Sequence, residues 1–130
     1  MRRSLLATVV ALCLMLVIVP GVSASGPGNS ANAHYCQDHA AAFGYASTGA
    51  CNQGLSAYQA KCESLGGVYQ TDRVETNTTQ LLTPSCSWWG ITLSQWNGYW
   101  PQLFPLCPPN ANGFAVFNSS ADPDNVGCTV

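Results

Sequence analysis

Six cysteines constrain this chain more than any other feature, because they are distributed along its whole length after the N-terminal segment. They are Cys36, Cys51, Cys62, Cys86, Cys107 and Cys128. An even number of cysteines in an exported chain is typical of a disulfide framework, here three bonds formed in an oxidising compartment. The intervening gaps of 14, 10, 23, 20 and 20 residues contain no C-x-x-C pair, so the spacing of a zinc site is absent. We therefore expect three disulfides, no metal and no cofactor.

The pairing of these cysteines is open, because six cysteines allow many connectivities. We favour Cys36–Cys51, Cys62–Cys86 and Cys107–Cys128. The first bond would close the turn between two predicted helices, and the third would hold a polar C-terminal segment in place. The second depends on Cys62, which lies on the apolar face of a predicted helix. Each bond would stabilise the fold by roughly 2–4 kcal/mol.

The first 24 residues have the pattern of a secretory signal peptide. Two arginines are followed by an uncharged apolar run, residues 5–19. Pro20 and Gly21 break this run, and residues 22–24 are small, as at a cleavage site. The alternative is an uncleaved anchor, since residues 4–24 carry no charge and are long enough to cross a bilayer. We predict cleavage after residue 24, which removes the seventh cysteine and leaves no stable membrane span.

Cleavage divides the rest of the chain into a flexible leader, residues 25–33, and a single cysteine-rich domain, residues 34–130. Lys61 and Arg73 are the cations of this mature chain, which also has six carboxylates and a net charge of −4. Two separated cations cannot neutralise a run of phosphates, so nucleic acid and anionic lipid are excluded as partners. We expect a secreted protein, located in the periplasm or at the cell surface if the source is bacterial.

Apolar spacing predicts two N-terminal helices. Residues 34–43 carry alanines and apolar residues at helical spacing, and Gly44 limits this helix to about three turns. The second helix has a clearer apolar stripe, formed by Leu55, Tyr58, Cys62 and Leu65. Ser56 begins a capping box for it, Asn52 is an alternative cap, and Gly66 ends it.

Extended chain is predicted after the helices. Residues 68–82 read as two short strands with a turn near Asn77, and residues 86–93 as a central strand. Two prolines prevent residues 94–107 from forming one long helix, so we expect a short helical turn at 95–100 followed by irregular chain. A last strand at 113–117 and a loop at 118–128 complete the prediction.

The predicted fold class is α+β, a small disulfide-stabilised domain in which two N-terminal helices pack on a small antiparallel sheet. The aromatic stretch 86–100 should dominate its core, since it holds all four tryptophans. A small domain needs this apolar area, so burial of every ring is one interpretation. However, Trp88 and Trp89 are adjacent in a predicted strand and would point to opposite faces. We therefore expect at least one ring to remain exposed and to contact a partner, the candidates being Trp89, Trp96, Tyr99 and Trp100.

Other motifs give weaker signals. His34 and His39 flank a cysteine, but their spacing of five places them off a common helix face, so we interpret them as exposed histidines. Residues 122–127 resemble a calcium loop without its distal glutamate, and we expect an acidic turn. Asn77 and Asn118 begin sequons that would accept glycans in a eukaryote. The sequence contains no nucleophile, zinc-protease or phosphate-loop motif, so we assign no catalytic residue.

Three classes of function fit these features. The one we favour is a secreted, non-catalytic binding module that uses aromatic side chains to hold an extracellular polysaccharide or protein. A small secreted hydrolase is an alternative, because paired carboxylates brought together from distant positions leave no local motif. A structural or inhibitory scaffold without a site of its own is the third.

Overall fold

A computed structural model describes residues 27–74, 81–118 and 123–130. The helices are α2 (Pro27–His39), α3 (Thr48–Ser64), α4 (Leu93–Leu103) and the 3-10 turn η2 (Phe104–Leu106). The strands are β1 (Val68–Gln70), β2 (Arg73–Val74), β3 (Leu81–Leu82), β4 (Ser85–Trp88), β5 (Asn112–Val116) and β6 (Asp124–Thr129). The chain is therefore a small α+β domain, as predicted.

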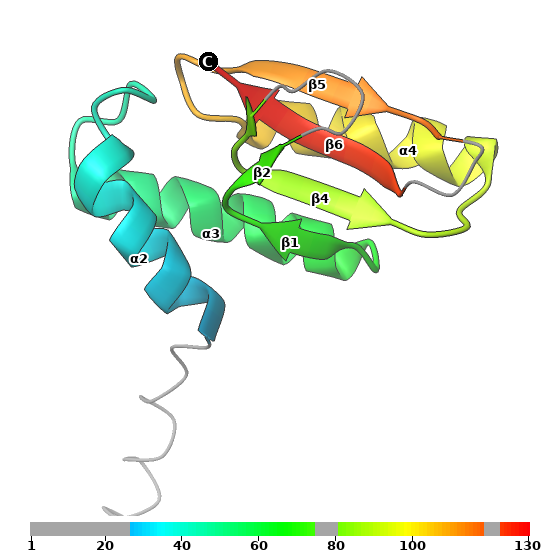
Figure 1. Cartoon of the computed structure of the whole chain (residues 1–130), viewed down its shortest axis with the longest axis horizontal. Helices are drawn as coiled ribbons and strands as arrows, with labels where there is room; N and C mark the ends of the chain where they lie inside the picture. Colours follow the sequence, from blue (N-terminus) through cyan, green and yellow to red (C-terminus); the bar gives the residue numbers. More distant parts are fainter. Residues whose placement is uncertain (1–26, 75–80, 119–122) are drawn as a thin grey trace, which may run out of the picture.

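Four strands form one antiparallel sheet in the order β1-β4-β6-β5, so that β4 and β6 lie at its centre. The short strands β2 and β3 pair separately with each other. Figure 1 shows α3 and α4 together on one side of the four-stranded sheet, with α2 packed beside α3. Helices α3 and α4 thus cover one face of the sheet, and the core lies between them and the central strands.

Helix α3 follows its predicted apolar stripe but begins earlier than expected. Its N-cap is Ser47, whose extended backbone and hydroxyl, which accepts the N–H of Ala50 at 3.0 Å, satisfy the first turn. The proposed caps at Asn52 and Ser56 were wrong, because both lie inside the helix. The helix ends where predicted, since Gly66 adopts a left-handed φ of 76°.

Helix α2 extends further towards the N-terminus than the composition suggests. It begins at Pro27, so residues 27–33 of the expected leader are helical. Asn32 explains this extension, because its buried side-chain amide donates to Gln59 Oε1 at 3.0 Å and its carbonyl oxygen accepts the Tyr69 hydroxyl at 2.6 Å. These contacts are made to α3 and β1, so a local reading of the sequence could not detect them.

Helix α4 corrects the expectation of a short turn and irregular chain in residues 94–107. Thr92 and Gln95 form a capping box, in which each side chain accepts the backbone N–H of the other at 3.1 and 2.9 Å. The helix then continues through Pro101, and η2 extends it. Pro101 removes one backbone donor near the end of the helix, a cost that burial of Trp96 and Leu103 against the sheet offsets.

Strand β6 is the largest departure from the predicted architecture. Residues 118–128 were expected to form a loop, but residues 124–129 form a central strand whose first five residues are buried. Val126 lies opposite Cys86 of β4 and Ala115 of β5, so β6 is paired along both edges. Its polar composition concealed this role, because strand propensity reflects the packing environment more than the backbone.

The other strand predictions need smaller corrections. The central strand expected at 86–93 is β4, which ends at Trp88. Residues 68–82 contain three short strands among the described residues instead of two, and the expected turn near Asn77 lies outside them. The strand expected at 113–117 is confirmed as β5, which runs from Asn112 to Val116 and ends before Phe117.

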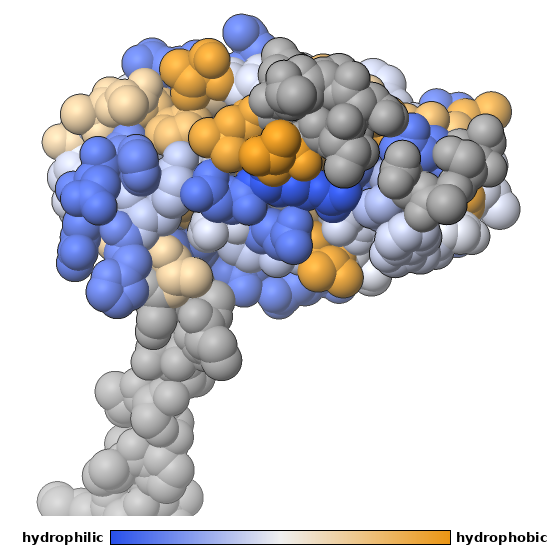
Figure 2. Space-filling view, viewed as in Figure 1, coloured by the Kyte–Doolittle hydropathy of each residue, from blue (hydrophilic) through white to orange (hydrophobic). Residues whose placement is uncertain are grey.

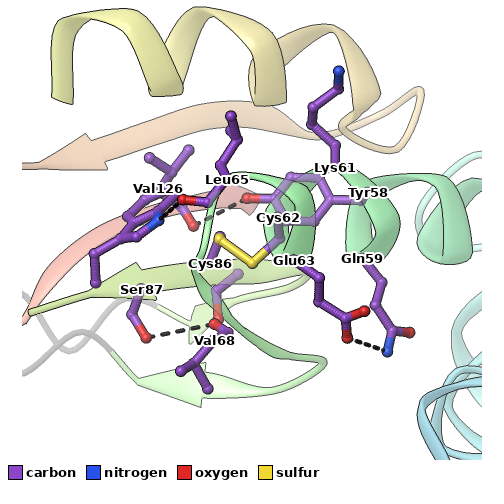
Figure 3. The surroundings of a disulfide bond; sticks show 12 residues. Tyr58, Gln59, Lys61, Cys62, Glu63, Leu65, Val68, Cys86, Ser87 and Val126 are labelled. Atoms are coloured by element: carbon purple, nitrogen blue, oxygen red, sulfur yellow. Dashed lines mark hydrogen bonds between the residues drawn. A yellow bond between two sulfur atoms is a disulfide. The ribbon is translucent and has the colours of Figure 1, made fainter. Parts of the chain in front are cut away.

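The structure contains the three disulfides Cys36–Cys51, Cys62–Cys86 and Cys107–Cys128, which is the pairing favoured from the sequence. Figure 3 shows how the second bond joins α3 to β4 in the middle of the core. Beside it, the Tyr58 hydroxyl donates to the backbone oxygen of Val126 at 3.0 Å, and the Trp88 indole N–H donates to that of Leu65 at 3.1 Å. The bond and these two hydrogen bonds fix α3 on the centre of the sheet.

The described part of the chain contains no helix that is both long and apolar enough to cross a membrane. The predicted signal peptide, residues 1–24, lies outside the described residues. Its cleavage therefore stays a prediction.

Candidate binding surface

The structure divides the aromatic stretch into core rings and surface rings. Trp88 is only 3% exposed, and its ring meets that of Trp96 edge to face at 6.3 Å. Trp89, the next residue along the chain, is 67% exposed. The expectation that at least one candidate ring remains exposed is therefore confirmed at Trp89, while Trp88 and Trp96 provide the core.

Trp89 is exposed because the chain leaves the sheet at this point. Strand β4 ends at Trp88, and Gly90 then turns the chain with a φ of 67°, a backbone conformation that residues other than glycine rarely adopt. Two residues later, Thr92 caps α4. Trp89 thus lies between a central strand and a capped helix, and its backbone is anchored on both sides.

Two further apolar side chains are exposed at the same end of the sheet. Strands β4 and β5 both run antiparallel to β6, so Trp89 and Phe117, which follow them, lie at the same sheet end. Leu93 begins α4 four residues after Trp89, and Phe117 packs its ring on Trp96 at 5.8 Å. We call Trp89, Leu93 and Phe117 the aromatic end; all three side chains are exposed.

The solvent side of α4 begins at Leu93, one of these three residues. Its exposed residues are Leu93, Ser94, Gln95, Asn97, Gly98, Pro101 and Gln102. Tyr99 and Trp100 are half-buried, the first against Trp88 at 5.4 Å and the second against Phe104 at 5.0 Å. The helix therefore presents amide and hydroxyl groups to solvent above a layer of aromatic rings.

The sequence-predicted binding residues are thus in three different environments. Trp89 is exposed, Tyr99 and Trp100 are half-buried, and Trp96 is buried beneath the surface. Trp96 and Trp100 lie four residues apart on α4, but their ring contacts are with different partners. Trp96 can therefore support the aromatic end from below but cannot itself offer a flat ring to a partner.

Sequence reasoning missed one signal that distinguishes this half of the domain. Between Glu75 and Asp122, from residue 76 to residue 121, the chain has no aspartate, glutamate, lysine, arginine or histidine. This stretch includes α4, η2, β4 and β5, so the three residues of the aromatic end and the solvent side of α4 carry no charge. The neighbouring Asp124 carboxylate, which lies opposite Trp88 in the sheet, is buried. The described surface charges lie on α2, α3 and the β1–β2 segment, at Asp38, Lys61, Glu63, Asp72 and Arg73.

A second exposed apolar group lies elsewhere on the molecule. Val74 of β2 and Leu81 of β3 are register partners, and both are exposed. Figure 2 shows hydrophobic atoms near the middle of the face that carries this strand pair. Neither side chain offers a flat ring, so the pair serves below as a control for the aromatic end.

Neither the histidines of α2 nor the acidic segment 122–127 forms a metal site among the described residues. His34 and His39 are exposed on α2, and His39 packs against the Tyr35 ring at 4.3 Å. Within the described ranges, no group of three His, Cys, Asp or Glu side chains could hold a metal ion. The acidic turn expected at residues 122–127 was wrong from residue 124 onwards, because that part is β6.

Asp124 and Asn118 brace the start of β6. The buried Asp124 carboxylate accepts the backbone N–H of Asn118 at 2.8 Å, and the Asn118 side-chain amide donates to the backbone oxygen of Pro123 at 3.0 Å. The asparagine of this sequon is thus engaged in the fold, while the sequon at Asn77 lies outside the described residues. Two other carboxylates also hold structural contacts, Glu63 with Gln59 at 2.9 Å and Asp72 with Thr83 at 3.4 Å.

The tyrosines beneath the surface are neutral structural groups. Burial raises the pKa of Tyr58 and of Tyr69 far above the usual range of a phenol, although the hydrogen bond to Asn32 opposes part of this shift at Tyr69. Burial also raises the pKa of Tyr45. At physiological pH the neutral phenols of Tyr58 and Tyr69 donate hydrogen bonds to Val126 and Asn32.

Comparison with known proteins assigns no family, since no protein-family model, curated sequence or solved structure matches the chain. The function must therefore be argued from the surface itself. What the structure provides is a disulfide-bonded α+β domain with an aromatic cluster, one ring of which, Trp89, is exposed between a central strand and a capped helix.

Proposed function

We propose that this chain is an exported, non-catalytic binding domain that holds its partner through the aromatic end. The observation that carries the proposal is the position of Trp89, which is 67% exposed although its neighbour Trp88 is buried. Exposing an indole ring to water is unfavourable, and exposed apolar groups that lie together mark interaction sites more often than scattered ones do. Leu93 and Phe117 extend the apolar surface around it.

The rigidity of the aromatic end supports a binding role. Trp89 directly follows a strand that the Cys62–Cys86 disulfide ties to α3, and the capping box at Thr92 fixes the next element. A ring held in this way loses little conformational freedom when a partner covers it. The aromatic end is therefore preorganised, and more of the burial energy remains available for affinity.

Export is supported by the disulfides and the N-terminal pattern. Three disulfides persist in an oxidising compartment and are rare in the cytosol. The apolar run at residues 5–19 and the small residues before residue 25 have the order of a secretory signal. Both features favour a function outside the cytoplasm.

The alternatives make different demands on the structure. A hydrolase would need two convergent carboxylates, whereas Glu63, Asp72 and Asp124 each hold a structural hydrogen bond. In a scaffold without a binding site, replacing Trp89 would not change the function of the protein. The aromatic end is therefore the feature that separates a binding domain from both.

The test is retention of the secreted, oxidised protein by a panel of insoluble glycans and immobilised extracellular proteins. Trp89→Ala should abolish retention with little change in thermal stability, because its ring is mostly outside the core. Val74→Ala is the matched control, since Val74 is 57% exposed on the separate strand pair and should leave retention unchanged. Equal retention of Trp89→Ala and wild type, or retention of wild type by no member of the panel, would contradict the proposal.

A further inference from the structure

The surface around Trp89 differs from the rest of the domain in its charge. Residues 76–121 contain no aspartate, glutamate, lysine, arginine or histidine, yet they supply the aromatic end and all of α4. Asp124, which lies opposite Trp88 in the sheet, is buried. The described surface charges belong to α2, α3 and the β1–β2 segment. A partner that binds here meets hydroxyls, amides and rings, and gains nothing from carrying a charge of its own.

The exposed positions of α4 form one stripe along the helix. Positions 94, 97, 98, 101 and 102 recur at helical spacing and are all exposed. Asn97 projects from this stripe, and the Gln102 side-chain amide donates to the backbone oxygen of Gly98 at 2.8 Å, which orients it along the helix. At a rise of 1.5 Å per residue, this stripe, from residue 94 to residue 102, is about 12 Å long.

Partners differ in how well they fit an uncharged, amide-bearing stripe with a flat ring at one end. Protein interfaces gain orientation and specificity from complementary charges, and this stripe supplies none. Acidic polysaccharides and nucleic acids need cations to neutralise them. A neutral sugar chain needs neither, because its hydroxyls pair with amides while the C–H face of a sugar ring packs on an aromatic ring.

We infer that the ligand of the aromatic end is an uncharged glycan, bound as a chain that stacks on Trp89 and runs along the exposed stripe of α4. This inference rests on the proposed function and deepens it, since it names the chemical class of the partner. Trp89 supplies the stacking platform, and Asn97 and Gln102 supply hydrogen bonds to hydroxyls.

The first experiment compares neutral with anionic glycans. Wild-type protein should be retained by at least one of insoluble cellulose, chitin and β-1,3-glucan, and not by heparin or alginate beads. Because none of the residues proposed to contact the glycan is charged, retention should be the same in low salt and in 1 M NaCl, a concentration at which the Debye length is only about 3 Å. Loss of retention in high salt would overturn the inference, since it would show that charges carry the interaction.

The second experiment locates the binding surface. Soluble hexasaccharides of the retained glycan should change the tryptophan fluorescence of wild type, and the corresponding monosaccharide should not, because one sugar unit cannot cover the stripe. Trp89→Ala should weaken hexasaccharide binding by roughly tenfold or more, and Asn97→Ala by a smaller factor while preserving the helix. Val74→Ala should bind as wild type does.

The outcomes separate this inference from the proposed function. Trp89-dependent retention by a protein or an anionic polysaccharide alone would leave the binding domain standing and overturn the assignment to a neutral glycan. Retention on a neutral glycan that survives both Trp89→Ala and Asn97→Ala would overturn the assignment of the surface. Absence of any Trp89-dependent retention would overturn both.

Discussion

The two apolar clusters of this domain are built in different ways. The main core, between the sheet and helices α3 and α4, contains Tyr58, Cys62, Cys86, Trp88, Trp96, Leu103, Val126 and Cys128. The small cluster between α2 and α3 contains Cys36, Ala40, Cys51 and Leu55. The main core therefore buries large rings around its disulfides, whereas half of the small cluster is the disulfide itself.

The polar contacts follow the same division. In the main core, the Tyr58 hydroxyl and the Trp88 indole each donate to a backbone oxygen across elements, which orients rings that packing already holds. Helix α2, which carries Cys36 of the small cluster, is joined by its buried Asn32 to Gln59 of α3 and to Tyr69, a ring that packs against the main core. Where apolar area is scarce, a covalent bond and a buried amide take over the role that ring packing has in the main core.

The largest expected effect comes from emptying the main core. Trp88→Ala removes a buried ring and leaves the backbone oxygen of Leu65 without its indole donor, so we expect a loss of about 3–5 kcal/mol in the free energy of unfolding. Denaturant unfolding monitored by far-UV circular dichroism measures this loss. Trp89→Ala is the adjacent control and should cost about 0.5 kcal/mol or less. Comparable losses in the two variants would remove the distinction between core ring and surface ring.

Breaking the small cluster should have a more local effect. The double variant Cys36→Ser/Cys51→Ser opens a loop with a sequence separation of 15, for which loop entropy gives about 3 kcal/mol. Because the main core keeps both of its own disulfides, we expect α2 to lose amide protection while β4 and β6 remain protected. Hydrogen exchange measures both regions in one sample. Equal loss of protection in α2 and β6 would show that the two clusters fold as one unit.

The smallest of these effects is a pH dependence that the main core should impose. Burial holds the phenol of Tyr58 neutral in the fold, whereas in the unfolded chain a tyrosine ionises near pH 10. Above that pH the unfolded state binds fewer protons than the native state, so stability falls as pH rises, by about 1.4 kcal/mol per pH unit for this group. Below pH 10 the contribution of the neutral Tyr58 phenol to the free energy of unfolding is fully present.

Tyr58→Phe tests this pH dependence directly. The variant has no phenol to ionise, so its stability should fall less steeply between pH 9 and 11 than that of the wild type, as measured by rapid denaturant titrations at each pH. Tyr45→Phe is the comparison in the α2–α3 region, where the ring is only half-buried and packs against the small cluster. If the two variants changed the slope equally, burial in the main core would not be the cause.

Local patterns predicted the elements that carry their own signals. The stripe through Leu55 and Cys62 and the stop at Gly66 defined α3, and the inward position of Cys62 led to its bond with Cys86. The adjacency of Trp88 and Trp89 predicted that one of the two would be exposed, although Trp89 is exposed because it follows the strand and not because it lies on the strand's opposite face. The candidate site was therefore visible in outline from the sequence.

The sequence by itself determined the α+β class and the presence of three disulfides, and it limited the exposed ring to four candidates, because spacing, helix periodicity and cysteine number act over short stretches. The tertiary structure alone decided that the polar segment 124–129 is a central strand, that Asn32 holds α2 in place, and that α4 continues through Pro101. The physical reason is the same in each case. Backbone pairing with two neighbouring strands, a hydrogen bond across 27 residues and burial against a sheet are interactions between distant segments, and they outweigh the local preferences of the residues that make them.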